Sequence, residues 1–230
     1  MRLSAFASLL ALTPALAAAQ MTAQPAKGAN TSDPDHQVAG GLSIPGWTAH
    51  FDRPGTAPTA VKFFPMGKGY HVIAGPAAIY FDSTKTGTGA YSARASFTQM
   101  KAPMHPEAYG LFVGGQNLSG DAAAYLYFLV RGDGKYAIKQ RAGANDVRSL
   151  VDWTASPAVH AADAAGKATN ALRVQVGADS VRFFANDRPV TALAVAKTGP
   201  LAGTAGIRVN HNLDVHVDGF SVYSGAAAAR

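Results

Sequence analysis

Cysteine is absent from the 230-residue chain. This absence excludes disulfide bonds, thiol catalysis and zinc sites that are built on cysteine. Any stable fold of this chain must therefore come from apolar burial and backbone hydrogen bonds alone.

Glutamate occurs only once, at Glu107, against thirteen aspartates. Glycoside hydrolases usually need two carboxyl groups about 5–10 Å apart. The chain also lacks the Gly-x-Ser-x-Gly motif of serine hydrolases, and no glycine cluster is followed by the Lys-Ser/Thr of a phosphate loop. These absences favour binding over catalysis.

Long charged or apolar runs are also lacking. The net charge of +6 is spread over single Lys and Arg residues, so a nucleic-acid partner is not expected. The apolar stretch Leu3–Ala15, which follows Arg2, is shorter than the roughly 20 residues of a membrane span. With the small residues Ala17–Ala19 behind it, this stretch predicts a Sec signal peptide over residues 1–19 and export to the periplasm or the cell exterior.

The remaining chain divides by composition into three parts. Residues 20–43 are small and polar and predict a flexible leader. Residues 44–223 are expected to form one domain, and residues 224–230 a flexible tail. The sequence carries no indication of the oligomeric state.

Short alternating segments dominate residues 44–223. The clearest is a predicted hairpin over Asn170–Asn186, in which apolar residues alternate on both arms and Gly177-Ala178-Asp179 provide the turn. The segments 109–115 and 124–130 are apolar on both faces, which is typical of strands in the middle of a covered sheet. About a dozen such segments predict an all-β, antiparallel two-sheet jelly-roll sandwich with an additional aromatic surface. Residues 157–168 could form a short helix or a turn.

The hairpin, together with Gly206–Val209 and Val217–Val222, resembles the concanavalin A-like lectin/glucanase superfamily. Within it, the chain is similar to laminin-G-like and 3-keto-disaccharide hydrolase-like domains. The resemblance implies a sandwich whose concave sheet and rim loops often hold glycans, in a superfamily that includes enzymes, lectins and modules without known ligand. The Glu-x-Asp-x-x-Glu motif of the glucanase branch is absent from this chain.

One candidate site surrounds the single glutamate. In an extended strand, His105, Glu107 and Tyr109 would lie on one face, where they could bind a sugar or transfer protons. If the protein is an enzyme, we expect Glu107 to act with His105 or Asp214. The alternative is a polar loop at the start of a strand.

A second candidate lies near the C-terminus. Asp214, His216 and Asp218 share one strand face and could hold a calcium ion, the one cofactor that the sequence suggests. The alternative is the solvated face of an edge strand. The preceding turn residues Asn210 and His211 are candidates for ligand contact.

Aromatic residues suggest a third candidate, because sugar rings stack on flat apolar surfaces. Tyr109, Tyr127, Arg131 and Trp153 would make such a platform if they share the concave sheet, and the alternative is that they are core residues. The sequence favours non-catalytic binding of carbohydrate or an envelope polymer. The alternatives are a glycoside-hydrolase-like enzyme for a (keto-)disaccharide, and a structural or interaction module of the envelope.

Overall fold

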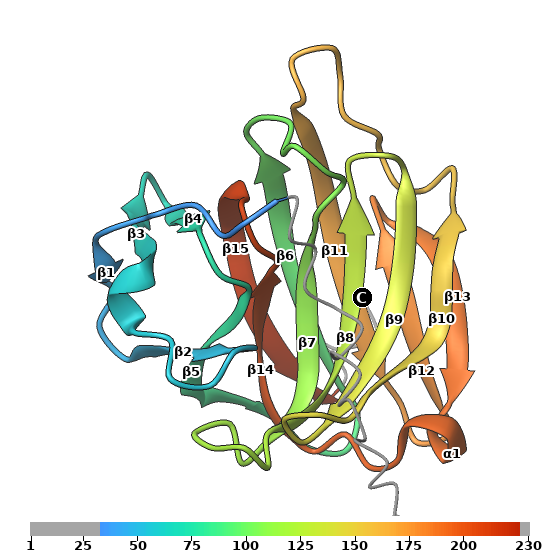
Figure 1. The fold of residues 1–230 in the computed structure, drawn as a ribbon. Coiled ribbons are helices and arrows are strands. Elements are labelled where there is room, and N and C mark those ends of the chain that lie inside the picture. The colour runs from blue at the N-terminus through green and yellow to red at the C-terminus, as the bar shows by residue number, and fades with distance from the viewer. Residues whose placement is uncertain (1–32, 226–230) are drawn as a thin grey trace, which may run out of the picture. The chain divides into compact units, whose positions relative to one another are not determined.

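Strands make up most of residues 33–225, the part of the chain that the computed structural model describes (Figure 1). Eight of them form one sheet, in the order β1 (Gly41–Leu42), β3 (Val61–Met66), β4 (Gly69–Ala74), β15 (Asp214–Ser224), β6 (Tyr91–Gln99), β11 (Ala168–Val176), β12 (Ser180–Ala185) and β13 (Arg188–Ala194). Neighbours in this sheet are antiparallel except for β1 and β3.

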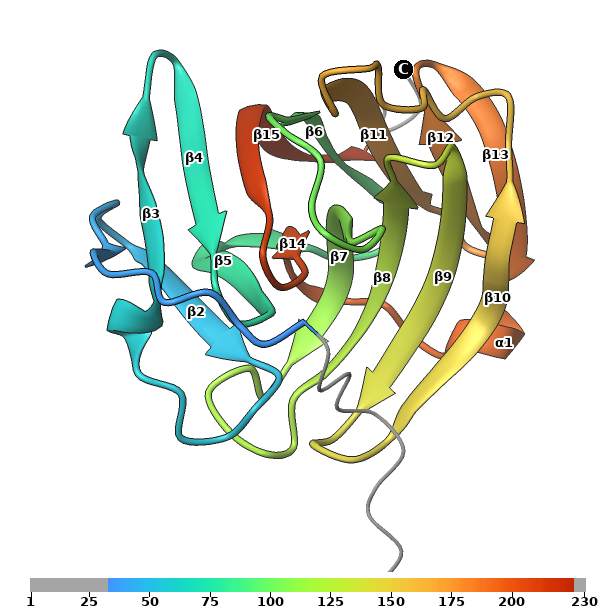
Figure 2. The same cartoon turned by 45° about the horizontal axis from the view of Figure 1, so that its top comes forward.

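Seven strands form the second sheet, which is antiparallel throughout. Their order is β10 (Val147–Ala155), β9 (Lys135–Ala142), β8 (Ala124–Arg131), β7 (Ala108–Gln116), β14 (Gly203–Val209), β5 (Ala78–Gly87) and β2 (Trp47–Phe51). Figure 2 shows β7, β8, β9 and β10 side by side. The helical elements are a 3₁₀ turn, η1 (Pro58–Ala60), and one α-helical turn, α1 (Val195–Thr198).

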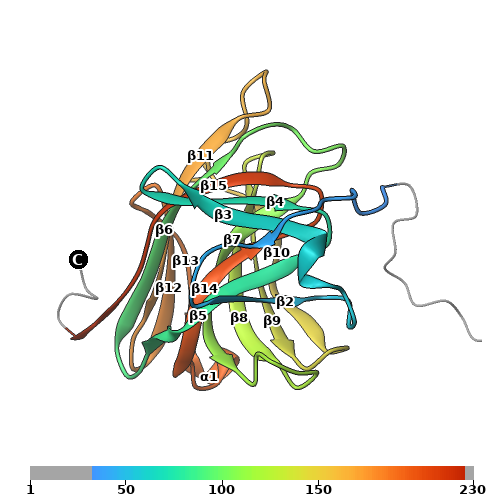
Figure 3. The same ribbon diagram turned by 90° about the vertical axis from the view of Figure 1, so that its left-hand side faces the viewer.

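The core lies between the two sheets. In the view of Figure 3, β6 and β12 lie on one side and β8 and β9 on the other. Phe128 from the seven-stranded sheet contacts Phe183 from the eight-stranded sheet, with ring centroids 5.4 Å apart, and both rings are fully buried. This arrangement is the two-sheet sandwich that the alternating pattern predicts.

The predicted hairpin is confirmed as β11 and β12. Leu172 pairs with Ala185 and Val176 pairs with Val181, and all four side chains are buried. The backbone N–H of Gly177 closes the turn by donating to the carbonyl of Ser180. The alternation of residues with a period of two therefore correctly predicted that these two strands pair and which of their side chains face the core.

The segments that are apolar on both faces are β7 and β8, and both lie inside the seven-stranded sheet as predicted. In β8, Leu126 and Phe128 belong to the core between the sheets, whereas Tyr125 and Tyr127 belong to a second apolar cluster. The two clusters contain alternate residues, so the second one lies on the opposite face of the sheet.

The structure adds detail at three places. Residues 157–168 form turns, one of the two predicted possibilities, and Asp163 stabilises one turn by accepting hydrogen bonds from the backbone N–H groups of Ala165 and Lys167. Strand β13 was not predicted, since Pro189 and weak alternation obscure it. Strand β5 continues to Gly87 through residues that read as a loop.

Part of the predicted flexible leader over residues 20–43 contacts the domain. Asn212, which has a φ of 56°, accepts a hydrogen bond from the N–H of His36 and donates to the carboxylate of Asp33. Strand β1 then pairs with β3. The predicted signal peptide (residues 1–19), the leader residues 20–32 and the tail residues 226–230 lie outside the described residues. Among residues 33–225, no helix has the length and apolarity to cross a membrane.

Candidate functional site

Aromatic side chains cover the outer face of the seven-stranded sheet, the face turned away from the core. Phe81, Phe112, Tyr125 and Tyr127 form a chain of contacts across β5, β7 and β8, with ring centroids 5.3 to 6.4 Å apart. Trp153 on β10 packs against this cluster and is half-buried. The outer face therefore carries an aromatic cluster whose rings are buried, except for Trp153, which is partly exposed.

Asp52, which directly follows β2, joins two arginines on this face. Arg208 on β14 donates two hydrogen bonds to its carboxylate, at 2.7 and 2.6 Å, and Arg141 on β9 donates one at 2.8 Å. Arg141 also donates to the hydroxyl of Tyr125 at 3.1 Å. Both arginine side chains are about 5% exposed. One carboxylate thus compensates two buried cations, and one positive charge remains.

The pKa values on this face follow from burial and from the charges. Burial would raise the pKa of Asp52, but the neighbouring Arg208 and Arg141 outweigh it and hold the pKa below its usual value of 3.8. Burial would lower the pKa of Arg208, but the attraction of Asp52 raises it. Burial raises the pKa of Tyr127 to about 12. Asp52 and Arg208 are therefore charged, and Tyr127 is a neutral hydrogen-bonding group, at neutral pH.

A line of polar side chains continues from Arg208 to the rim. Arg208 donates from Nε to Asn210 at 3.0 Å, and Asn210 donates from Nδ2 to Glu107 at 3.2 Å. Nε2 of His211 lies 2.8 Å from Glu107, and its Nδ1 lies 3.3 Å from Asp35. All four rim residues are half-buried. The imidazole of His211 therefore lies between two carboxylates.

At the β10 side of the same face, two cations surround Trp153. The guanidinium of Arg131 lies 4.2 Å from the ring centroid, and the ammonium of Lys139 lies 5.9 Å from it. Asp133 orients Arg131, which donates to it from Nε at 3.0 Å. In the adjacent row, Lys139 pairs with Tyr127 across β8 and β9. Trp153 is thus an aromatic ring with positive charge on its borders.

The structure brings together three of the four residues of the predicted platform. Tyr127, Arg131 and Trp153 lie on the outer face, but Tyr109 points into the core. There it is fully buried and accepts a hydrogen bond from Asn170. The prediction for Tyr109 is wrong, because the strand alternation of β7 places it on the inner side with Leu111.

The predicted catalytic residues are not bonded to one another. Glu107 contacts Asn210 and His211, which were predicted as ligand-binding residues, and not His105 or Asp214. Among the described residues, His105 has no partner for its buried Nε2 atom. Asp214 lies on the other sheet, where His71 contacts it at 2.8 Å and Lys101 at 3.6 Å.

The predicted metal ligands do not converge. Val215 and Val217 point into the core as expected, but Asp214 pairs with His71, and His216 pairs with Asp218 at 3.1 Å. Within residues 33–225, no three His, Asp or Glu side chains are grouped as a metal site requires. The alternative of an edge strand is also wrong, since β15 lies between β4 and β6. Calcium binding remains an untested prediction.

The central group of this face, Asp52 with Arg141 and Arg208, was not predicted from the sequence. The partners of Asp52 lie 89 and 156 residues away along the chain, so no local pattern connects them. One signal was present: Arg208 is a single charged residue in an otherwise apolar strand. Such a residue needs a buried counter-charge.

Comparisons with known proteins give the fold but no family. No family model and no curated protein matches the chain. Its structure is similar to that of the carbohydrate-binding module CBM66 from Bacillus subtilis, with a TM-score of 0.58 and 12% identity over 82% of this chain and 100% of that one.

Two further solved structures are similar. A Bacillus subtilis protein of unknown function with a galectin-like fold has a TM-score of 0.56 and 12% identity over 77% of this chain and 88% of that one. Alginate lyase A1-II′, a member of polysaccharide lyase family 7, has a TM-score of 0.51 and 8% identity over 79% and 95%. At such identities the likeness concerns the fold, which is a concanavalin A-like jelly-roll sandwich.

Proposed function

We propose that this protein binds carbohydrate on the outer face of its seven-stranded sheet. One observation carries the proposal: a line of polar groups from His211 to Arg141 lies on the same sheet face as an aromatic cluster that ends in the partly exposed ring of Trp153. Sugars need both, because their hydroxyl groups form hydrogen bonds and their C–H faces stack on rings. A carbohydrate-binding module is among the proteins with this fold, which agrees with the proposal.

The two ends of the face have different roles in this proposal. Trp153 is half-buried and is the stacking surface, while Arg131 and Lys139 beside it donate hydrogen bonds to ring oxygens or hydroxyls. At the rim, Glu107 and Asn210 bind further hydroxyl groups. Arg208 and Asp52 hold these polar groups in place, and such preorganisation lowers the entropy cost of binding.

The location of the protein belongs to the same proposal. The signal peptide predicted over residues 1–19 would export it, so that it meets its ligand in the periplasm or outside the cell. The ligand is then carbohydrate or a carbohydrate-containing envelope polymer. A nucleic acid is not the expected partner, because the basic residues form no continuous run.

The proposal is tested with the full chain on a glycan array, followed by calorimetric titration of the glycans that bind. We expect Trp153→Ala to weaken binding about tenfold or more, as loss of an aromatic anchor does. Phe64→Ala is the matched control, because Phe64 is also half-buried and has a cation, Lys62, 4.8 Å from its ring, but lies on the other sheet. Absence of glycan binding, or unchanged binding by Trp153→Ala, would overturn the proposal.

A second candidate function, cleavage of a glycan, rests on the rim. Glu107 and Asp35 contact the two ring nitrogens of His211, so two carboxyl groups lie within the separation that glycosidases use. One carboxyl group would donate a proton to the leaving oxygen, while the other activates the attacking water. The alternative function is therefore that of an enzyme that cleaves a simple disaccharide or a keto-disaccharide.

Turnover distinguishes the two functions. We expect an enzyme to lose turnover of a disaccharide panel in Glu107→Gln while its unfolding midpoint persists. Asp146→Asn provides the control, because Asp146 is an exposed carboxylate in the turn between β9 and β10. If the wild-type protein cleaves none of the disaccharides, the binding function stands alone.

A further inference from the structure

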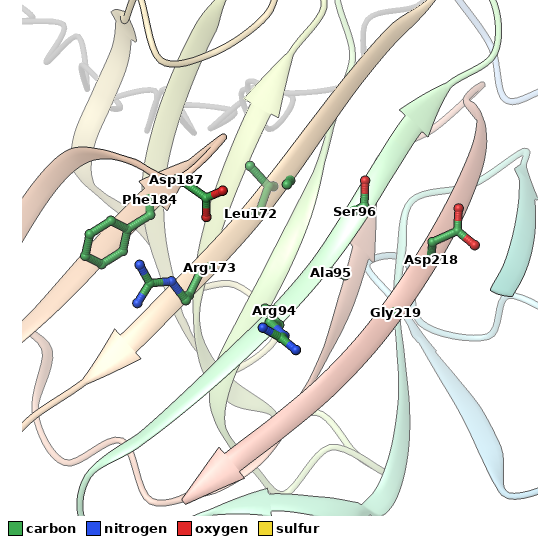
Figure 4. Close-up of a pocket in the computed structure, with 10 residues that line it drawn as sticks. Arg94, Ala95, Ser96, Leu172, Arg173, Phe184, Asp187, Asp218 and Gly219 are labelled. Carbon is green, nitrogen blue, oxygen red and sulfur yellow. The ribbon is translucent and has the colours of Figure 1, made fainter. Parts of the chain in front are cut away.

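A shallow groove crosses the outer face of the eight-stranded sheet, on the side of the molecule opposite Trp153. Its volume is about 380 Å³, and it lies over β6, β11, β12 and β15 (Figure 4). Arg94 and Arg173 occupy its middle, with Asp187 and Asp218 on opposite sides. The residues of the proposed carbohydrate site take no part in this groove.

Arg94 and Arg173 are direct cross-strand partners in the β6–β11 pair. Their chain neighbours Ala93, Ala95 and Leu172 point into the core, so both arginines point outward. Side chains in this relation have Cβ atoms about 4.5–5.5 Å apart, and like charges placed there repel each other. A pair of cations at such positions is therefore unfavourable for the fold alone.

Aromatic rings hold the two guanidinium groups. Arg94 lies 4.6 Å from the ring centroid of Tyr223 and donates to its hydroxyl at 2.8 Å. Arg173 lies 4.0 Å from the ring centroid of Phe184. These contacts fix the guanidinium planes at the groove without neutralising them.

The carboxylates near the groove leave both charges uncompensated. Within residues 33–225, no Asp or Glu oxygen lies within 4.0 Å of either guanidinium group, although Asp52 and Asp133 form such pairs with arginines elsewhere. Asp218 contacts His216. The middle of the groove therefore presents two fixed, partly solvated cations.

We propose that this groove is a second binding site, for an acidic polysaccharide whose sugars carry carboxylate groups. Guanidinium groups bind carboxylates through paired, charge-assisted hydrogen bonds. Phe184 offers an apolar surface for the sugar ring, and Asp187 and Asp218 accept hydrogen bonds from its hydroxyls. Because the groove is shallow, it suits a segment of an extended chain.

The carboxylates at both sides of the groove favour this ligand over a nucleic acid. The sugar–phosphate backbone of a nucleic acid carries a phosphate at every nucleotide and few free hydroxyl groups, so it offers Asp187 and Asp218 little to bind. A uronate chain carries hydroxyl groups beside each carboxylate, so its carboxylates can meet the arginines while its hydroxyl groups donate to Asp187 and Asp218. With the proposed carbohydrate site on the opposite sheet, one molecule would connect two polysaccharide chains.

The test is calorimetric titration of the full chain with oligogalacturonate at low salt, and with its neutral methyl ester. We expect the acidic oligomer to bind, the methyl ester to bind at least about tenfold more weakly, and the double variant Arg94→Gln/Arg173→Gln to lose about tenfold or more in affinity for the acid. Arg148→Gln, which removes one exposed charge from β10, should bind as the wild type does. Far-ultraviolet circular dichroism checks that each variant folds.

Two further measurements test the site independently of whether the double variant folds. In the wild-type protein, oligogalacturonate should protect Arg94 and Arg173 from modification by phenylglyoxal, as read by peptide mass spectrometry, whether or not the double variant folds. Trp153→Ala should retain acid binding, which separates this site from the proposed carbohydrate site. Full binding by the double variant, loss of acid binding in Trp153→Ala alone, or arginine-dependent binding of duplex DNA in place of the oligogalacturonate would overturn the inference.

Discussion

Both sheets carry a pair of charged arginines on the outer face, but the two faces accommodate the charges in opposite ways. On the seven-stranded sheet, Arg141 and Arg208 are buried and share the carboxylate of Asp52. On the eight-stranded sheet, Arg94 and Arg173 have no carboxylate partner among the described residues and rest on aromatic rings.

Burial explains the difference. A buried cation without a partner costs several kcal/mol, so Arg208 requires Asp52. A partly solvated cation keeps much of its hydration and can remain unpaired, so Arg94 and Arg173 are available to a ligand. The first pair of arginines therefore supports the fold and organises a site, whereas the second pair is maintained at a small cost to stability.

The largest effect is expected from Asp52→Asn. This change removes the charge that compensates two buried guanidinium groups and should lower the free energy of unfolding by about 3–5 kcal/mol. Urea denaturation at neutral pH measures it. Asp146→Asn removes an exposed carboxylate and should stay within about 0.5 kcal/mol of the wild type. If both substitutions lowered the free energy of unfolding equally, Asp52 would contribute no more to stability than an exposed carboxylate does.

Lowering the pH should remove the contribution of Asp52 to stability more gradually than the substitution does. The pKa of Asp52 lies below its usual value of 3.8, since Arg208 and Arg141 outweigh the effect of burial. Its contribution is therefore complete above the unfolded pKa and is lost as the pH falls through the lower, folded pKa. In denaturation series from neutral to acidic pH, the stability difference between wild type and Asp52→Asn should shrink below pH 3.8. A constant difference would contradict the assignment of that pKa.

Most of the fold could be predicted from the sequence, because core-facing apolar residues alternate with outward-facing residues along the strands of the sandwich. Leu172 and Val174 specify the inner face of β11, and Leu126 and Phe128 specify that of β8. For residues 157–168 the sequence left a short helix and a turn open, because a single side chain, Asp163, decides between them.

The candidate site was predictable only in part. Glu107 and His211 could be named, since a lone glutamate and a polar turn are visible in the sequence, but their contact joins residues 104 positions apart. Whether Tyr109 points into the core or outward depends on the register of β7, and a shift of one residue reverses the direction of its side chain. Contacts between distant strands are set by sheet order, which alternation does not encode.

A smaller effect is expected from Phe184→Ala on the eight-stranded sheet. The ring is half-buried and supports the guanidinium of Arg173 at 4.0 Å. Its loss should lower stability by about 1–2 kcal/mol, from lost apolar burial and the lost cation–π contact. Thermal and urea unfolding measure the change. Phe183→Ala in the same strand, whose ring is fully buried in the core, should cost about 3–5 kcal/mol, and similar losses would mean that Phe184 is a core residue.

The smallest effect should come from Arg173→Gln, and here its dependence on salt is the informative quantity. The change removes a cross-strand repulsion with Arg94, of about 0.2–1 kcal/mol, together with a cation–π contact of similar size, so stability at moderate salt should hardly change. Salt screens the repulsion in the wild type. Raising the salt concentration in urea denaturation should therefore stabilise the wild type relative to Arg173→Gln, whereas Arg148→Gln should show no such trend. The absence of a salt-dependent difference would mean that the two arginines do not repel each other, and that a carboxylate compensates them in the same way as Asp52 compensates Arg208.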